Sequence, residues 1–457
     1  MDRDSLANKL VDIVGKDNVL TSDKDREDYS TDMAEFKADP LVVVRPGSED
    51  QVAKVVAIAD ENVLPILARG AGSSLTGAAV LAGGIIVDMR RMDKVIHVDP
   101  VNWYVRVQPG ISLSDLNKEL KKDGFFFPPD PASSYICTVG GAIAEGSGGL
   151  RCVKYGTMKD WVLSVRVVLP NGTITTMGEP LAKNRAGYDL LHLIVGSEGT
   201  LGIVTEAHLK IIPLPPRPDK RLLATFDSWE DVGSVISDFR KSAMVPGLFE
   251  FIDSVHIKAI NEKLEQNLDV AEATLIIDVG EENLARVLDI LKSRGSRSIK
   301  IAQSEEEAET LYEVRANALL AIKTLAPTAQ VEDVSVPLDR LSQFLKKAKE
   351  IAADNSVLIP VMGHAGDGNV HPTLLFDGND SESSANAARA TAEIRRTAVS
   401  LGGSISGEHG IGTQKVKFLR EQLRSHEGEE SLRLMKEIKR LFDPKGIMNP
   451  GKYVEAA

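Results

Sequence analysis

The stretch Arg69-Gly70-Ala71-Gly72-Ser73-Ser74-Leu75-Thr76-Gly77 lies between two short apolar runs, residues 65–67 and 85–88, which are typical of strands. Glycine adopts backbone angles that turn several N–H groups toward one point, and such a nest binds phosphate. The spacing matches neither G-x-G-x-x-G opening a helix nor the Walker pattern with its lysine. A phosphate-bearing ligand is indicated, but a nicotinamide or ATP site is not.

Two more glycine segments follow this loop. They are Gly140-Gly141-Ala142-Ile143-Ala144-Glu145-Gly146-Ser147-Gly148-Gly149 and Gly196-Ser197-Glu198-Gly199-Thr200-Leu201-Gly202. One glycine loop is usually only a tight turn. Three in one domain favour a surface on which the backbone closely approaches a large flat cofactor.

The pattern around these loops predicts an α+β domain. Residues 52–59 and 113–120 have helical apolar spacing, and Asn171-Gly172 predicts a hairpin turn. The strands predicted for this part of the chain are residues 41–44, 65–67, 85–88, 95–98, 104–107 and 162–169.

Four prolines within residues 213–218 forbid both a helix and a central strand, so we expect a domain boundary there. With 457 residues the chain is too long for one core. Beyond the boundary, residues 221–226, 274–279 and 357–361 resemble strands, and residues 284–291 and 341–351 have amphipathic helical spacing. A sheet with helices packed on one side is expected.

The composition excludes some classes of protein. A formal net charge of -12, with no basic run, makes nucleic acid an unexpected partner. No apolar run approaches the roughly 20 residues of a membrane span, and no leader is recognised, so a cytoplasmic location is expected. Cys137 and Cys152 form no disulfide framework. The oligomeric state stays open, with a homodimer the commonest arrangement.

A second motif indicates a metal. His364-Ala365-Gly366-Asp367-Gly368-Asn369-Val370-His371 is followed by Gly407-Glu408-His409-Gly410. His364, His371 and Glu408 are the donors that a catalytic zinc accepts, although manganese or iron suits them too. His409 is then available as a general base. Alternatively, His364 and His371 are loop residues that hydrogen-bond to carbonyls. His97, His192, His208 and His256 are expected to be ordinary polar residues.

At these residues the chain resembles a known family. The three glycine segments look like the FAD-binding domain of the vanillyl-alcohol oxidase and p-cresol methylhydroxylase superfamily. The motifs of residues 364–371, 407–410 and 443–452 resemble the FAD-linked D-2-hydroxyacid dehydrogenases. That group includes D-lactate dehydrogenases, the flavin subunit of glycolate oxidase and D-2-hydroxyglutarate dehydrogenase. The similarity runs from about residue 40 to residue 452.

The resemblance implies an FAD-binding domain at residues 1–213, a substrate-cap domain at 214–400 and a segment at 401–457 that returns to the FAD domain. No histidine stands in the first loop, so dissociable FAD is expected. Where many relatives have an asparagine-alanine pair, this chain has Glu145-Gly146; Glu145 would repel the cofactor, point elsewhere, or pair with Arg151 or Lys154. The implied FAD-binding residues are Arg69, Gly70, Gly72, Ser73, Ser74, Thr76, Gly77, Pro131, Thr138, Gly140, Gly141, Ala144, Gly148, Tyr155, Gly156, Glu198, Gly202, Ile203 and Asn449.

The implied reaction is oxidation of D-lactate or glycolate to the 2-oxoacid, with a metal on the hydroxyl, His409 as base and hydride transfer to flavin N5. Arg315 resembles the arginine that anchors the substrate carboxylate. Alternatives are D-2-hydroxyglutarate oxidation, which needs a further cation, and a flavin subunit of a multi-subunit glycolate oxidase that depends on an iron-sulfur partner. A zinc hydrolase is a third, disfavoured because H-E-x-x-H is absent. The electron acceptor is not indicated.

Overall fold

A computed structural model describes residues 3–34, 36–215 and 219–454. The chain forms two compact units. The first comprises Met1–Gly149, Thr157–Leu214 and Glu408–Ala457; the second comprises Leu150–Gly156 and Pro215–Gly407. Of the proline-rich segment at the expected boundary, residues 216–218 lie outside the described residues. The domain limits 1–213, 214–400 and 401–457 stay predictions.

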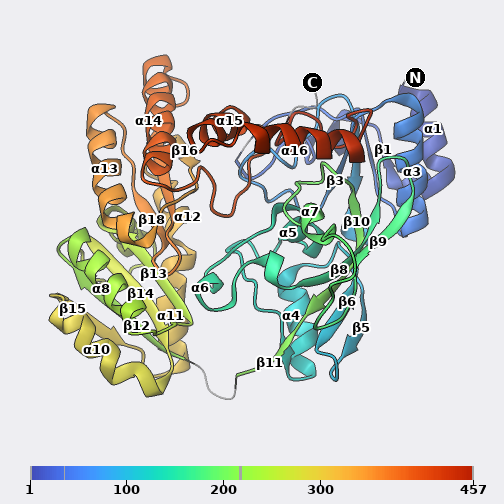
Figure 1. Ribbon diagram of the computed structural model, residues 1–457. Coiled ribbons are helices and arrows are strands. Elements are labelled where there is room, and N and C mark those ends of the chain that lie inside the picture. Colours follow the sequence, from blue (N-terminus) through green and yellow to red (C-terminus); the bar gives the residue numbers. More distant parts are fainter. Residues whose placement is uncertain (1–2, 35, 216–218, 455–457) are drawn as a thin grey trace. The chain divides into compact units, whose positions relative to one another are not determined.

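The first unit contains two main sheets (Figure 1). One has the order β1-β2-β4-β3, in which β2, β4 and β3 run parallel; the other is antiparallel in the order β5-β6-β10-β8-β9, and β7 pairs with β11. The strands are β1 (Val19–Leu20), β2 (Val42–Val44), β3 (Ile66–Arg69), β4 (Ile85–Asp88), β5 (Val95–Asp99), β6 (Tyr104–Val107), β7 (Phe125–Phe126), β8 (Val162–Val168), β9 (Ile174–Gly178), β10 (Ile203–Lys210) and β11 (Ile212–Pro213).

Helices of the first unit cover these sheets and begin at side-chain caps that the sequence supplies. Ser48 caps α3 and Ser112 caps α4, each by accepting a backbone N–H of the first turn. Val52, Val55, Val56 and Ala59 of α3 pack against the strand residues of the parallel sheet. The helices are α1 (Arg3–Val14), α2 (Asp23–Glu27), α3 (Glu49–Asn62), α4 (Leu113–Lys122), α5 (Val139–Glu145), α7 (Leu191–Ile194), α15 (Val416–Ser425) and α16 (Glu429–Phe442).

The C-terminal segment closes the parallel sheet of the first unit. The N–H of Ile66 donates to the carbonyl of Ile447 at 2.8 Å, and the N–H of Asn449 donates to the carbonyl of Ile66 at 2.8 Å. Met448 is fully buried in the same core as β2, β3 and β4. A segment almost 400 residues away in sequence therefore lies directly beside the strand that leads into the first glycine loop.

The second unit is built on an eight-stranded antiparallel sheet in the order β15-β12-β14-β13-β18-β19-β16, with β17 also paired to β19. Its strands are β12 (Lys220–Phe226), β13 (Leu248–Asp253), β14 (Ala273–Val279), β15 (Ser298–Ile301), β16 (Thr328–Val331), β17 (Val334–Ser335), β18 (Val361–His364) and β19 (Asn369–Phe376). Its helices are α6 (Cys152–Tyr155), α8 (Trp229–Lys241), α9 (Ser254–Lys263), α10 (Leu284–Ser293), α11 (Glu305–Ala316), α12 (Ala318–Ile322), α13 (Leu341–Asp354) and α14 (Ser381–Ser400).

Helices cover both faces of this sheet, whereas the sequence predicted helices on one side. Side chains alternate along β12, so Leu222 and Phe226 enter one core with α8, α10, α13 and α14. Leu223 enters another core with α9, α11 and α12. The α+β class is confirmed; the second layer was missed because only the helices of the first were identified.

The strand predicted at residues 357–361 is wrong. Residues 357–360 form no strand apart from one bridge between Leu358 and Leu375, and β18 begins only at Val361. Pro360 has no N–H to donate to a ladder, which explains why regular pairing starts after it. Within the described residues, no helix is both long and apolar enough to cross a membrane.

Candidate active site

The three glycine segments of the first unit lie against one another. A Cβ atom added to Gly70 would lie 2.1 Å from Oγ1 of Thr138, which caps α5. A Cβ on Gly146 would lie 3.2 Å from Cα of Gly196, and the N–H of Gly196 donates to the carbonyl of Ile143 at 2.9 Å. The glycines therefore permit close backbone packing of all three segments.

Arg69 shapes the first loop from behind. Its guanidinium donates to the carbonyls of Ala79, Thr31 and Asp28 at 2.6, 2.8 and 3.1 Å, and its side chain is buried. A Cβ on Gly72, which has φ +74°, would lie 2.2 Å from Nη2 of Arg69. Through these bonds Arg69 connects the first loop to residues 28–31, and its predicted role in FAD binding stays a prediction.

The three glycine segments form what we call the glycine surface, and a fourth segment, residues 410–414, contacts its first loop. The carbonyl of Thr76 accepts hydrogen bonds from Thr413 and Gln414, and Oγ1 of Thr76 donates to the carbonyl of His409 at 3.3 Å. Asn449 is fully buried and donates through Nδ2 to the carbonyls of Ala78 and Glu198. The first loop is thus held by two segments near the C-terminus.

Glu198 anchors the same segment with an ionisable group. Its Oε1 accepts the N–H of Ile411 at 2.6 Å, and its Oε2 accepts that of Gly412 at 2.8 Å. Burial raises the pKa of Glu198 to about 7, although these two N–H groups oppose the shift. A Cβ on Gly410 would lie 2.5 Å from Oε1 of Glu198 and 2.7 Å from Oε2 of Glu145, so both carboxyl groups border that glycine.

Within the part of the chain that the structure describes, no ion pair joins Glu145 to a cation, and its Oε2 faces Gly410 in this cluster. Burial raises its pKa well above the ordinary value, and the negative charges of Glu198 and Asp32 add to the effect, while a hydrogen bond with Ser74 opposes it. Lys154, one of its two expected partners, pairs with Asp219 at 3.4 Å. The raised pKa favours the uncharged carboxyl of Glu145 and so lessens the expected repulsion of an anionic cofactor.

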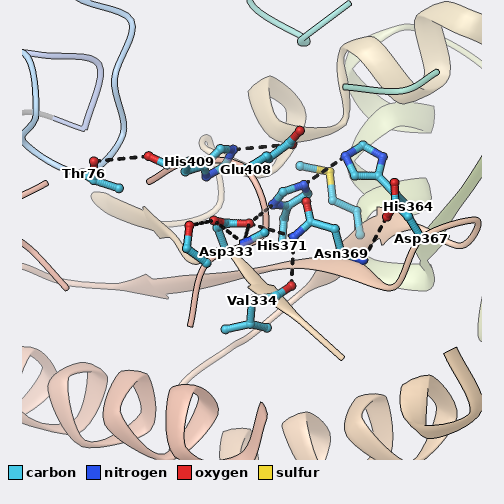
Figure 2. Close-up of polar contacts among 12 residues, drawn as sticks. Thr76, Asp333, Val334, His364, Asp367, Asn369, His371, Glu408 and His409 are labelled. Carbon is cyan, nitrogen blue, oxygen red and sulfur yellow. Dashed lines mark hydrogen bonds and ion pairs between the residues drawn. The ribbon is translucent and has the colours of Figure 1, made fainter. Parts of the chain in front are cut away.

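In the second unit, the first histidine motif forms a hairpin between β18 and β19. Met362 pairs with His371 and His364 with Asn369, so the two histidines are diagonal neighbours on one face of the sheet. Their imidazoles turn toward each other, with Nε2 atoms 3.3 Å apart (Figure 2). Both side chains are buried. The plain-loop interpretation is wrong for both histidines, because His364 ends β18 and His371 lies within β19.

Asp333, which the sequence analysis did not identify, holds the second motif against this hairpin. Its carboxylate accepts hydrogen bonds from Nδ2 of Asn369 at 2.7 Å, from Oγ of Ser406 at 2.6 Å and from the N–H of Gly407 (Figure 2). A Cβ on Gly407 would lie 2.1 Å from Nδ2 of Asn369. Glycine is needed in this motif because of that close approach.

Glu408 and His409 follow Gly407 directly. Adjacent Cα atoms are about 3.8 Å apart, so the chain itself keeps Glu408 next to the residue that Asp333 fixes. Oε1 of Glu408 and Nε2 of His409 lie 3.8 Å apart, and both side chains are mostly buried. Beyond them the chain enters the segment held by Thr76 and Glu198. Glu408 and His409 are therefore flanked in the chain by residues that are held on both sides, Gly407 and Ile411.

The other predicted residues fall into both units. Arg315 lies on α11 and is buried, and its Nε donates to Glu250 at 2.7 Å. Tyr155 and Gly156 group with the second unit, whereas Pro131, Gly148, Gly202 and Ile203 belong to the first. Four further histidines are structural: His192, His208 and His256 bond to Asp189, Ser164 and Asp253, and His97 contacts Tyr104.

Several buried polar atoms near the glycine segments of the first unit lack a hydrogen-bond partner within the described residues. Among them are Oγ of Ser197, Oδ1 of Asn449 and Oε2 of Glu145. Unsatisfied buried polar atoms are rare in native proteins and call for a ligand or water. The surface thus combines narrow backbone packing with acceptors and a hydroxyl, which suits a flat polar cofactor.

Comparison with known proteins identifies that cofactor. Residues 40–178 match the model of an FAD binding domain, and residues 215–453 match that of the C-terminal domain of FAD linked oxidases. A glycolate oxidase subunit GlcD of Bacillus subtilis is 38% identical over 97% of this chain and 95% of its own length. A D-lactate dehydrogenase of Anaerostipes hadrus is 34% identical over 95% of this chain and 94% of its own.

Among solved structures, p-cresol methylhydroxylase with substrate bound covers 99% of this chain and 97% of its own, with a TM-score of 0.83 at 19% identity. This likeness confirms the two-domain FAD-binding fold, and the relatives confirm the resemblance that the motifs showed. The chain is therefore an FAD-linked oxidoreductase and belongs to the family of FAD linked oxidases that includes the FAD-linked D-2-hydroxyacid dehydrogenases.

Proposed function

We propose that this enzyme oxidises a D-2-hydroxy acid, D-lactate or glycolate, to the corresponding 2-oxoacid with dissociable FAD as the electron acceptor. The observation that carries the proposal is the pair of facing imidazoles, His364 and His371, in the same unit as Asp333, which binds the N–H of Gly407 directly before Glu408 and His409 in the chain. The names of the relatives, glycolate oxidase subunit and D-lactate dehydrogenase, support the same substrates.

The FAD would lie on the glycine surface of the first unit, with its pyrophosphate on the loop from Gly70 to Gly77. Ser73, Ser74 and Thr76 supply hydroxyl groups, and residues 70–77 contain no histidine for a covalent link. Bound FAD would supply an acceptor for hydride, that is, for two electrons and one proton. The unpartnered atoms of Ser197 and Asn449 are candidates for contacts with it.

A divalent metal, with zinc the first choice, would be held by His364, His371 and Glu408. Two nitrogens and one carboxylate oxygen form the donor set of an open catalytic site. The metal would supply Lewis-acid polarisation of the substrate hydroxyl. The residues fit, because two imidazole Nε2 atoms only 3.3 Å apart converge on one point, where a cation or proton relieves the repulsion of their lone pairs.

The remaining roles fall to His409 and Arg315. His409 would accept the hydroxyl proton while the C–H hydrogen leaves as hydride, which balances the conversion of CH(OH) to C=O. Arg315 donates Nε to Glu250 and contacts Met362 through Nη1; among the described residues no hydrogen bond uses its Nη2. That nitrogen would bind the substrate carboxylate.

The test is the absorption spectrum of the FAD-loaded protein under anaerobic conditions. D-lactate or glycolate should bleach the flavin band, whereas L-lactate should do so far more slowly. A strong preference for D-2-hydroxyglutarate would overturn the substrate assignment. A protein that binds no FAD, or whose FAD no 2-hydroxy acid reduces, would overturn the proposal as a whole.

A second candidate is the flavin subunit of a larger oxidase, which the word subunit in the name of the Bacillus relative favours. Adding an artificial electron acceptor to the same experiment distinguishes the two candidates. If the isolated chain is reduced by substrate and passes electrons repeatedly to an artificial acceptor, it does not depend on a partner. If substrate reduces its FAD once but repeated turnover with the artificial acceptor requires other subunits, the second candidate is correct.

A further inference from the structure

We infer that Glu250 is a positioning residue that fixes the orientation of His364 and couples it to Arg315. The inference rests on the proposed function, because it concerns the metal site proposed there. Neither Glu250 nor this coupling was indicated by the sequence motifs. It assigns a role to a buried carboxylate that lies outside both histidine motifs.

The geometry places Glu250 between the two partners. On β13 it is the direct cross-strand neighbour of His364 on β18. Its Oε1 lies 2.6 Å from Nδ1 of His364, and its Oε2 accepts a hydrogen bond from Nε of Arg315 at 2.7 Å. Glu250 is 0% exposed. Each carboxylate oxygen thus serves one partner, and neither bond depends on a flexible surface side chain.

The chemistry follows from what a carboxylate can accept. An ionised carboxylate has no proton to give, so the bond with His364 requires a proton on Nδ1. The lone pair of His364 is then on Nε2, the atom that faces Nε2 of His371. Such carboxylate–histidine pairs orient metal-binding imidazoles, and losing the outer residue typically weakens metal binding about 10- to 100-fold.

Arg315 places a positive charge directly beside this carboxylate. A buried carboxylate without a partner is costly, so the guanidinium neutralises Glu250 where water does not reach it. The same guanidinium is the proposed anchor of the substrate carboxylate. Glu250 is therefore the shared contact between the substrate-anchoring cation and a proposed metal ligand, and a change at Glu250 should affect both.

A buried ion pair that serves only folding would have the same distances, so the test must measure metal binding rather than activity. The double variant Glu250→Met/Arg315→Met removes both charges and fills similar volume, which avoids an unpaired buried charge. The matched control is Arg221→Met/Asp278→Met, which removes an arginine–carboxylate pair that is joined by two hydrogen bonds and lies on the same sheet as Glu250. Zn²⁺ affinity is measured with a competing chelator on the full chain loaded with FAD.

We expect the Glu250 double variant to bind Zn²⁺ about 10- to 100-fold more weakly, with its FAD content unchanged, and the control to match the wild type. Equal Zn²⁺ affinity in the double variant and the wild type would overturn the inference. If the wild type itself binds no Zn²⁺ or other divalent metal, the proposed metal site fails instead, so the two failures are distinguishable.

The single variant Glu250→Gln refines the result. The amide keeps one acceptor oxygen but places an NH₂ group against either Arg315 or His364, so it should bind Zn²⁺ more weakly than wild type. With Co²⁺ as the probe, a changed visible spectrum would report altered ligand geometry at His364. A Co²⁺ spectrum and Zn²⁺ affinity both identical to wild type would count against the positioning role.

Discussion

The two units build their sites in opposite ways. In the first unit the surface is made of backbone: Gly70 packs on Thr138 and Gly146 on Gly196, where an added Cβ would lie 2.1 and 3.2 Å, respectively, from its nearest neighbour. In the second unit the site is made of side chains that project from paired strands, His364 and His371, each held by neighbours. The first should therefore respond to any added carbon, and the second to the loss of particular nitrogen and oxygen atoms.

The largest effect is expected at the segment that joins the two units. His409→Ala should lower the rate of flavin reduction by about 10²- to 10⁴-fold, the usual contribution of a general base. FAD content should not change, because the first loop is held by Thr76, Glu198 and Asn449 rather than by the imidazole. Stopped-flow reduction at saturating substrate measures the effect.

His192→Ala is the control, since His192 is bonded to Asp189 and to the carbonyl of Lys159 at the surface. Its reduction rate should equal that of the wild type. If the reduction rate of His409→Ala also stays within threefold of the wild-type rate, His409 is not the general base.

The buried carboxyl groups of the backbone-built surface should make the stability of the protein depend on pH. Burial raises the pKa of Glu198 from 4.5 to about 7 and that of Glu145 well above its ordinary value. A raised pKa means that the folded state favours the protonated form. The contribution of these carboxyl groups to the free energy of unfolding is therefore complete below about pH 4.5 and is lost as the pH rises through 7. For Glu198 alone this loss is roughly 3 kcal/mol.

Urea unfolding of the FAD-free protein between pH 5 and pH 8 tests this expectation. Glu145→Gln, which stays neutral, should lose less stability over that range than the wild type. Asp32, whose pKa burial also raises, keeps part of the dependence in both proteins. A stability that is flat or rises with pH in the wild type would show that these carboxyl groups are solvated in the folded protein.

The sequence predicted the backbone-built surface better than its surroundings. Glycine is informative because only it tolerates a contact such as that between Gly70 and Thr138, so three clusters in one domain indicated a cofactor surface. His364 and His371 were also found, through their motif. Asp333 and Glu250 were not, because a lone acidic residue in a strand or loop has no spacing signal; only the register of β13, β18 and β19 brings them to the histidines.

Asp333 offers an intermediate effect on the side-chain site. Asp333→Asn replaces one acceptor oxygen by an NH₂ group that faces Ser406 and the N–H of Gly407. Losing a hydrogen bond to a charged group costs about 2 kcal/mol, so unfolding of the protein should require correspondingly less urea. Asp339→Asn, which removes an exposed ion pair with Arg340, should change the stability by under about 0.5 kcal/mol. Equal effects of both changes would mean that Asp333 anchors nothing.

Gly70→Ala should have the smallest effect and tests the contrast most directly. The new Cβ would lie 2.1 Å from Oγ1 of Thr138, so the loop or the Thr138 side chain must move, at a cost of about 1–2 kcal/mol. That cost corresponds to FAD binding weaker by about tenfold, measured by fluorescence titration of the FAD-free protein. Adding Thr138→Ala removes the clashing oxygen and should restore part of the affinity, although it also removes the cap of α5. If Gly70→Ala binds FAD as tightly as the wild type, close backbone packing is not what shapes this surface, and the glycines there are only turns.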